Sequence, residues 1–364
     1  MLKRFEVIGY KNFKNRFIMD LSKIRDYKFN PEAIRYDIVN TAIIYGKNAV
    51  GKTNFGRAIL DIRNNIFSSN VVHSNNLDFL NADSDLSSAE FVYEFQFDDV
   101  IVTYSYKKSD VTSLDYEELY IDAKLIFQYD HLNKKLLNNN LDKIKAQTLT
   151  FEFANDSISI LSYIINNTSL SSDHPMKKMY NFIRGMRLIR GNLLSERLLG
   201  FDTIINSIIK NNLVDDFEKF LNHFGINEKL IVINTPTGDK MLCFDHSRPI
   251  AFIQNCSSGT ASLVQLYSWY QNLTTASFLY LDEFDAFYHY ELSKKIISLF
   301  KKISTCQTIT TSHNTDLLTN KIMRPDCLFI LTKEKITALA DATNRELREG
   351  HNLEKLYKSG EFNE

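Results

Sequence analysis

The sequence predicts an α/β fold, because a glycine-rich loop of fixed spacing stands between an apolar strand and an amphipathic helix. Residues 46–53 read GKNAVGKT, which is the G-x-x-x-x-G-K-T pattern of phosphate-binding loops. The apolar run 41–45 before the loop predicts a buried strand. Residues 54–66 predict a helix, whose apolar face comprises Phe55, Ile59, Ile62 and Ile66. This context favours nucleotide binding over an ordinary turn with a solvated lysine.

Each residue type in this loop suits a bound triphosphate. Backbone N–H groups of the loop, including those of Gly46, Asn48 and Gly51, would surround phosphate oxygens, and the helix N-terminus adds partial positive charge. Lys52 would reach the β- and γ-phosphates, and the hydroxyl of Thr53 would ligate Mg²⁺. We therefore expect ATP and Mg²⁺ as cofactors.

Composition and charge narrow the class of protein. The 364 residues are 44% hydrophobic and 24% charged, which is ordinary for a globular protein of one large or two modest domains. The formal net charge of −1 gives no global attraction to nucleic acid, so such contacts would need a local patch. The four cysteines form no C-x-x-C pair, and no signal peptide or membrane span is evident. We expect a soluble, cytoplasmic protein.

Strands dominate the predicted structure on both sides of the phosphate loop. Residues 2–21 alternate apolar and polar side chains and predict two strands. Residues 91–97 and 100–106 alternate in the same way around a two-residue turn, which predicts a hairpin. Two further runs extend this β-rich arm: 118–121 and 124–127.

The middle of the chain changes to a helical pattern. Residues 157–224 carry apolar side chains at helical spacing, and strands return at 230–233 and 240–244. Residues 68–88, rich in Ser, Asn and Asp, are expected to form a loop, and the Asn- and Lys-rich segment 132–145 is expected to be mobile.

A run of basic residues lies in this predicted helical segment, with Tyr180 and Phe182 among them. The run comprises Lys177, Lys178, Arg184, Arg187, Arg190 and Arg197. It suits a nucleic-acid or partner-binding surface, although such a run is more often a solvated helix face with acidic partners.

Three later motifs carry polar groups suited to nucleotide chemistry. The turn Ser257-Ser258-Gly259 precedes a predicted helix at 261–272, where it forms either an anion site or an ordinary N-cap. The apolar run 278–281 ends in two carboxylates, which is typical of a Mg²⁺-site strand in phosphate-loop enzymes. There Asp282 would hold the metal and Glu283 would polarise the attacking water, unless both are solvated acids at a strand end.

The third motif is the β-rich run 307–312, which ends in a polar tip containing His313. His313 could contact the γ-phosphate, and a surface histidine on a loop is the simpler alternative.

The order of these motifs resembles an ABC-type ATPase head. It resembles the RecF/SMC-like branch, most closely the OLD-like and RloA-like (AriA-like) ATPases of bacterial phage-defence systems. The matching segments are the opening strand and NF turn (5–13), Walker A (45–53), a shortened signature (257–260), Walker B with D-loop (281–285), His289, the switch histidine (311–314) and the tail (352–360).

This resemblance implies a phosphate-loop NTPase fold of ABC-head type, with a β-rich arm and a helical insertion. The implied divisions are the N-terminal part of the head (1–75), the arm (76–155), the insertion (156–228) and the C-terminal part of the head (229–364). It also implies a head-to-head homodimer, possible higher oligomers and composite ATP sites. In each site Lys52, Thr53, Asp282, Glu283 and His313 of one subunit would face Ser257, Ser258 and Gly259 of the other.

The implied function is a Mg²⁺-dependent, ATP-hydrolysing switch that controls a nuclease or toxin encoded nearby, in anti-phage defence. The alternative is a RecF-like, DNA-binding repair ATPase. The sequence contains no nuclease motif, which argues against a self-contained nuclease. The residues of the nucleotide-binding motifs are intact, which argues against an inactive scaffold. Two departures from the family pattern are Tyr290, where proline is usual, and the loop glutamine, for which Gln96 is the nearest candidate.

Overall fold

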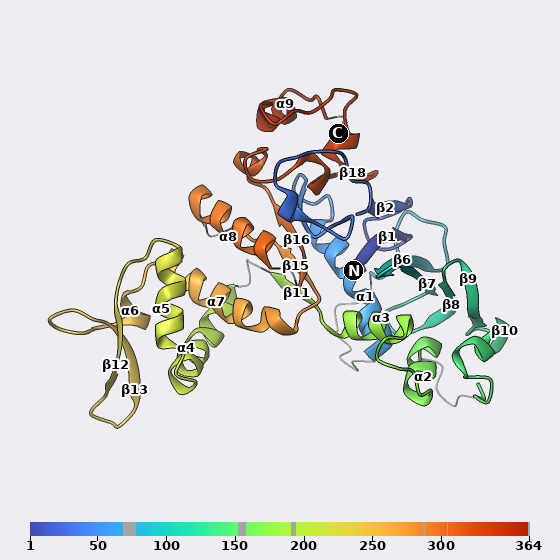
Figure 1. The fold of residues 1–364 in the computed structure, drawn as a ribbon, viewed down its shortest axis with the longest axis horizontal. Coiled ribbons are helices and arrows are strands. Elements are labelled where there is room, and N and C mark those ends of the chain that lie inside the picture. Colours follow the sequence, from blue (N-terminus) through green and yellow to red (C-terminus); the bar gives the residue numbers. More distant parts are fainter. Residues whose placement is uncertain (68–77, 152–157, 191–193, 287, 304, 363–364) are drawn as a thin grey trace.

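A computed structural model gives the fold and describes residues 1–362 except 68–77, 152–157, 191–193, 287 and 304 (Figure 1). Two large sheets lie on either side of one central helix, and a group of helices with a small sheet extends from them. The predicted α/β class is confirmed.

The first large sheet is mainly parallel and carries the phosphate loop. Its six strands lie in the order β11-β15-β16-β5-β17-β18, and only the β17–β18 pair is antiparallel. The strands are β5 (Thr41–Tyr45), β11 (Met186–Arg190), β15 (Phe278–Asp282), β16 (Gln307–Ser312), β17 (Leu328–Leu331) and β18 (Ile336–Ala338). Every residue of β5, β15, β16 and β17 is buried, so this part of the sheet is covered on both faces, as parallel sheets usually are.

The second large sheet is antiparallel, with seven strands in the order β10-β9-β8-β7-β6-β1-β2. They are β1 (Leu2–Ile8), β2 (Phe17–Asp20), β6 (Ala89–Phe97), β7 (Val100–Lys108), β8 (Leu114–Ile121), β9 (Lys124–Asp130) and β10 (Lys135–Asn139). The predicted hairpin is β6–β7, and the two N-terminal strands and both extending strands are also confirmed. The segment 132–145, expected to be mobile, contains β10 and a 3-10 helix, Leu141–Ile144.

Helix α1 (Lys52–Phe67) follows the phosphate loop and lies between the two large sheets (Figure 1). The four predicted apolar positions are all buried. Toward the antiparallel sheet, the rings of Phe55 and Phe5 are 5.6 Å apart. Toward the parallel sheet, the hydroxyl of Tyr280 donates to the carbonyl of Lys52 over 2.7 Å. The helix that begins at the phosphate loop is therefore fixed on both sides.

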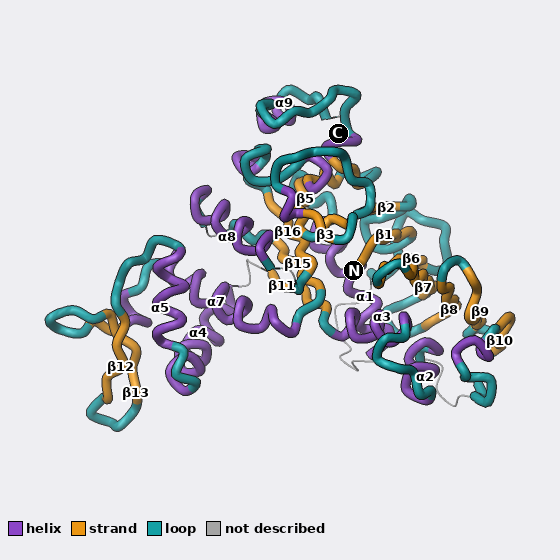
Figure 2. Tube along the Cα trace, viewed as in Figure 1, coloured by secondary structure: helices purple, strands orange, loops and turns teal. Residues whose placement is uncertain are grey.

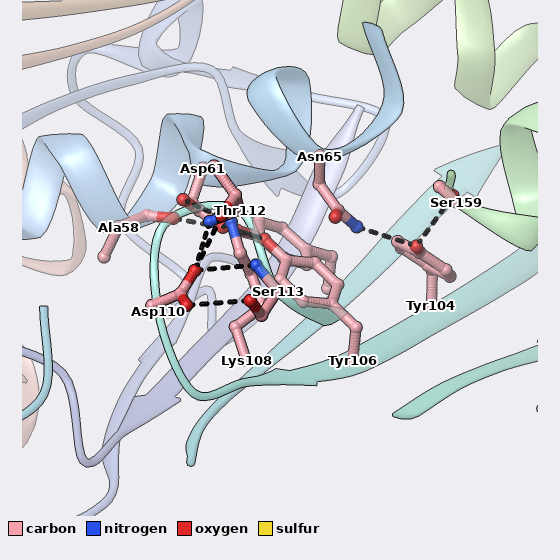
Figure 3. Close-up of polar contacts among 11 residues, drawn as sticks. Ala58, Asp61, Asn65, Tyr104, Tyr106, Lys108, Asp110, Thr112, Ser113 and Ser159 are labelled. Carbon is pink, nitrogen blue, oxygen red and sulfur yellow. Dashed lines mark hydrogen bonds and ion pairs between the residues drawn. The ribbon is translucent and has the colours of Figure 1, made fainter. Parts of the chain in front are cut away.

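A seam of buried polar groups also joins α1 to the arm (Figure 3). The Asp61 carboxylate accepts from the hydroxyl of Tyr106 over 2.8 Å and lies 3.3 Å from the ammonium of Lys108. Asn65 donates to the hydroxyl of Tyr104 over 3.0 Å. Because buried polar groups need partners, these contacts fix how α1 packs against β7.

The predicted helical region is confirmed over most of its length. It contains α2 (Ile160–Asn167), α3 (Pro175–Arg184), α4 (Leu194–Lys210) and α5 (Val214–His223). The prediction is wrong at Met186–Arg190, which forms β11 and pairs in parallel with β15. A five-residue run between helices has too little periodicity to identify itself, and its pairing with a distant strand decides its structure.

The two strands predicted at 230–233 and 240–244 belong to a separate small sheet. It consists of β12 (Leu230–Asn234), β13 (Lys240–Phe244) and β14 (Ile250–Ala251), and lies with α5 and α6 (Phe252–Asn255) at one end of the molecule (Figures 1 and 2). Helix α7 (Ser258–Asn272) packs against α4 and α5 and leads back to β15.

The remaining elements complete the parallel-sheet side of the molecule. They are β3 (Ile34–Arg35), β4 (Ile38–Val39), α8 (Tyr290–Lys302), α9 (Leu353–Lys358) and the 3-10 helices Pro31–Ala33, Leu273–Thr275, Thr315–Leu317, Pro325–Cys327 and Leu339–Asp341. Among the described residues, none of the helices has the length and apolar character needed to span a bilayer.

Candidate nucleotide site

The phosphate loop leaves β5 and enters α1 through two glycines that the backbone requires. A Cβ atom at Gly46 would lie 2.7 Å from the carbonyl oxygen of Leu331, so only glycine fits against β17. Gly51 has φ +107°, a conformation that residues with side chains rarely adopt. The two glycines of the motif are therefore required by the path of the backbone as well as by phosphate binding.

Lys52 is buried at the start of α1, with its ammonium turned toward the loop. It donates to the carbonyls of Gly46, over 2.8 Å, and Lys47, over 3.1 Å, and lies 3.4 Å from Nδ1 of His313. Burial lowers the pKa of Lys52, and nearby carboxylates, Glu283 first among them, oppose that shift. A cation in this position is available to phosphate oxygens at the loop.

Thr53 and Asp282 come together from α1 and β15. The Thr53 hydroxyl donates to Oδ2 of Asp282 over 2.6 Å, and Asp282 is buried. A hydroxyl and a carboxylate are the hard oxygen ligands that Mg²⁺ prefers. Within the described residues no three His, Cys, Asp or Glu side chains form a metal-binding group. The pair fits a Mg²⁺ ion that completes its shell with phosphate and water.

Glu283 and His313 lie at the neighbouring ends of β15 and β16. Nε2 of His313 is 3.6 Å from Oε1 of Glu283. Both side chains line an open pocket of about 390 Å³, which is also lined by Asn48, Asp285, Ala286 and Asn314. Because carboxyl ends of parallel strands meet at one edge, residues far apart in the sequence converge beside the phosphate loop.

Asp285 belongs to this pocket but was not among the predicted site residues. Burial raises the pKa of Asp285, while a hydrogen bond from the Ser312 hydroxyl, 2.5 Å long, acts in the opposite direction. Burial also raises the pKa of Tyr45, and the negative charge of Asp285 adds to that shift. One sequence signal could have identified Asp285 as a site residue: it follows Glu283 by two positions, in the same cluster of acidic residues.

The serine-rich turn does not join this pocket within the chain. Oγ of Ser257 accepts from the N–H of Thr260 over 3.1 Å. Ser257 is therefore the N-cap of α7, which is one of the two alternatives that the sequence offered. Ser257 and Ser258 are exposed, and Gly259 is half-buried. The N-terminal end of α7 lies beside α6, well separated from α1 (Figure 1).

Two minor candidates also lie outside the pocket lining. Gln96 is at the turn of the β6–β7 hairpin, where its side chain donates to the carbonyl of Asp98 over 3.2 Å. His289 is exposed and precedes α8 without capping it through its side chain. At the pocket edge of the sheet, Arg190 is the register neighbour of Asp282, so β11 ends beside the end of β15.

The predicted basic run is divided among different elements. Lys177, Lys178 and Arg184 are on α3, whereas Arg187 and Arg190 are on β11; the side chain of Arg197 lies outside the described residues. Lys178 pairs with Asp98 over 2.7 Å. The Arg184 guanidinium lies 5.1 Å from the ring of Tyr180, and Arg187 donates to the carbonyl of Arg184 over 2.7 Å.

A phosphate loop on a parallel sheet, with α1 between that sheet and an antiparallel one, is the arrangement of a P-loop NTPase fold. The chain belongs to the family described as "AAA domain, putative AbiEii toxin, Type IV TA system", whose model matches residues 42–319. No curated protein matched the chain.

Several solved structures are similar to this chain. An SMC head bound to the C-winged helix domain of ScpA has 15% identity and a TM-score of 0.49, covering 93% of this chain and 97% of that one. The SMC head domain from Thermotoga maritima has 14% identity and a TM-score of 0.44, covering 93% and 98%. RecF with ATP, from the RecFOR pathway, has 15% identity and a TM-score of 0.39, covering 93% and 99%.

Proposed function

We propose that this chain is a Mg²⁺-dependent ATPase that acts as a molecular switch and assembles head to head into a homodimer. The observation that carries the proposal is the convergence of five side chains at one edge of the parallel sheet, from the start of α1 and from the ends of β15 and β16: Lys52, Thr53, Asp282, Glu283 and His313. Each of these side chains has a chemical property suited to a bound Mg²⁺–triphosphate.

In this proposal the loop N–H groups and Lys52 bind the β- and γ-phosphates. Thr53 and Asp282 hold Mg²⁺, which when bound neutralises charge that develops on the phosphates. Glu283 orients and polarises a water molecule in the pocket, and His313 hydrogen-bonds the γ-phosphate. The 3.6 Å separation of Glu283 and His313 lets both act on the same end of the nucleotide.

The dimer is proposed because the serine-rich turn suits a phosphate that its own chain does not supply. Ser257 and Ser258 are exposed at the start of α7, a helix whose N-terminal end attracts anions. A second copy could place its γ-phosphate against this turn, so ATP would favour the closed pair and hydrolysis would favour opening.

Control of an effector in anti-phage defence is the proposed biological role. The family description names a toxin of a toxin–antitoxin system, and the sequence resembles phage-defence ATPases. The structure supplies candidate contact surfaces beyond the nucleotide site in the β-rich arm and in the small sheet β12–β14. A nuclease or toxin encoded nearby is the proposed partner.

Phosphate release tests the ATPase directly. Lys52→Ala should abolish Mg²⁺-dependent release, whereas Lys124→Ala, at the exposed first residue of β9, should leave it unchanged. Equal rates for Lys52→Ala and wild type would end the proposal. Glu283→Gln should accumulate as an ATP-bound dimer in light scattering after size exclusion, and a monomer at saturating ATP would contradict the dimer.

One observation favours the second candidate, a nucleic-acid-binding ATPase. Burial lowers the pKa of Arg63 on α1, and the neighbouring charge of Arg187 lowers it further, so arginines from α1 and β11 lie close together. Nε of Arg63 is buried without a hydrogen-bond partner among the described residues. A phosphate backbone would relieve this repulsion.

The salt dependence of ATPase stimulation by DNA tests this candidate. Stimulation should fall steeply with salt and disappear in a variant with Arg63, Arg184 and Arg187 changed to glutamine. A control variant with Lys135, Lys143 and Lys145 changed to glutamine loses the same charge at the far end of the arm. Equal stimulation in both variants would exclude the arginine surface.

A further inference from the structure

Thr311 opens the segment that resembles the switch-histidine motif, but that resemblance gives Thr311 itself no role. It is the fifth residue of β16 and is completely buried, between the metal-site strand β15 and the phosphate-loop strand β5. Its neighbour Thr310 is also buried, so the sequence does not distinguish the two hydroxyls. Their hydrogen bonds in the structure do.

The Thr311 hydroxyl is used in both directions. Oγ1 accepts from the backbone N–H of Glu283 over 2.8 Å, and it donates to Oδ1 of Asp282 over 2.8 Å. An ionised carboxylate only accepts and an N–H only donates, which fixes the direction of both bonds. One hydroxyl therefore connects the proposed metal ligand with the backbone of the proposed water-orienting residue.

The backbone of Glu283 needs such a connection. Its φ is +51°, in the left-handed region that non-glycine residues seldom occupy. Conformations of this kind persist when surrounding contacts hold them, and they occur often at functional sites. Release of the N–H would let Glu283 return to an ordinary conformation and redirect its carboxylate away from the pocket.

The second carboxylate oxygen of Asp282 links the Thr311 hydroxyl to the proposed metal site. Oδ2 accepts from Thr53, so the two hydroxyls hold the carboxylate from α1 and from β16. Mutation of a group that orients a metal ligand typically costs about 10- to 100-fold in metal affinity or activity. A change at Thr311 should therefore act on Mg²⁺ use and on turnover together.

We propose that Thr311 is a positioning residue that sets the orientation of the Asp282 carboxylate and of the Glu283 backbone for hydrolysis. This inference rests on the proposed ATPase function. Thr311 itself touches neither nucleotide nor water in this account, and it acts through the two acidic residues.

Other bonds keep the two strand ends joined when the hydroxyl is removed. The N–H of Phe284 donates to the carbonyl of Thr311 over 3.3 Å, and Ser312 donates to Asp285. Valine has nearly the shape of threonine, so Thr311→Val should fold and retain ATP binding. The matched control is Thr310→Val on the same strand; in the part of the chain that the structure describes, the Thr310 hydroxyl bonds only to the carbonyl of Ala42, over 3.3 Å.

The experiment compares steady-state ATPase rates of wild type, Thr311→Val, Thr311→Ser and Thr310→Val across Mg²⁺ concentrations, with thermal unfolding of each. Thr311→Val should lose about 10- to 100-fold in kcat or in apparent Mg²⁺ affinity, while the KM for ATP changes little. Thr311→Ser should recover most of the loss, and Thr310→Val should resemble wild type.

Three results would overturn the inference. The first is an ATPase rate and Mg²⁺ dependence of Thr311→Val equal to those of Thr310→Val. The second is a Thr311→Ser variant as impaired as Thr311→Val, and the third is a loss of ATPase activity that follows only the folded fraction. If Thr311→Val does not fold, Thr311→Ala is compared with Thr310→Ala by the same criteria. An inactive wild type would instead refute the ATPase proposal, so the two failures are distinguishable.

Discussion

Gly56 on α1 is predicted to be essential because the ring of Tyr280 occupies the space beside it. A Cβ atom at Gly56 would lie 2.3 Å from Cε1 and 2.4 Å from Cδ1 of Tyr280. The ring is fully buried and its hydroxyl bonds to the carbonyl of Lys52, so it has little freedom to move. Gly56→Ala must therefore push α1 away from β15 or displace the ring.

The expected change in the free energy of unfolding combines two destabilising contributions and one stabilising contribution. Overpacking of a core costs about 1–3 kcal/mol. Loss of the buried hydrogen bond from Tyr280 adds about 1 kcal/mol. The better helix propensity of alanine returns about 1 kcal/mol. The sum is a free energy of unfolding lower by about 1–3 kcal/mol. ATPase activity should fall as well, since the shift occurs one turn after Lys52 and Thr53.

Urea unfolding measures the cost, with Gly200→Ala as a matched control. Gly200 is in α4, and a Cβ atom there would meet nothing within 4 Å. That substitution should stabilise the chain by up to about 1 kcal/mol through helix propensity alone. Tyr280→Leu should relieve Gly56→Ala in the double variant. A Gly56→Ala chain as stable as Gly200→Ala would refute the packing argument.

Two further predictions concern buried carboxylates. Asp61→Asn leaves the ammonium of Lys108 buried without its ion-pair partner, so urea unfolding should show a loss of about 3 kcal/mol. A free energy of unfolding equal to that of wild type would contradict a stabilising role for the ion pair between Asp61 and Lys108. Burial raises the pKa of Asp285 above 3.8, so ionisation opposes folding as pH rises through and beyond that value. Asp285→Asn should therefore raise the free energy of unfolding at pH 7.5, with a smaller gain at pH 4; an equal gain at both values would contradict the burial argument.

The sequence predicted those parts of the fold whose signals are local. The phosphate loop is encoded by Gly46, where a side chain would meet the carbonyl of Leu331, and by Gly51, which has a positive φ. β15 appears as a continuous apolar run that ends in Asp282. Both patterns are complete within a few residues. The β6–β7 hairpin is similarly defined by alternation on either side of a short turn.

Contacts between distant segments account for what the sequence did not predict. β11 is a strand because it pairs with β15, whereas its five residues by themselves predict part of a helical region. Gln96, the nearest candidate for the loop glutamine, lies instead at the β6–β7 hairpin, where it donates to the carbonyl of Asp98. The special role of Thr311 likewise depends on which residues its hydroxyl meets.

The central claim is that one nucleotide is held between two copies of the chain. Subunits carrying Lys52→Ala and subunits carrying Ser258→Arg should each be inactive alone. Mixed in equal amounts and allowed to exchange, they should recover about a quarter of wild-type phosphate release, because half of the twofold dimers then contain one intact composite site. A mixture no more active than the separate variants would contradict the shared site.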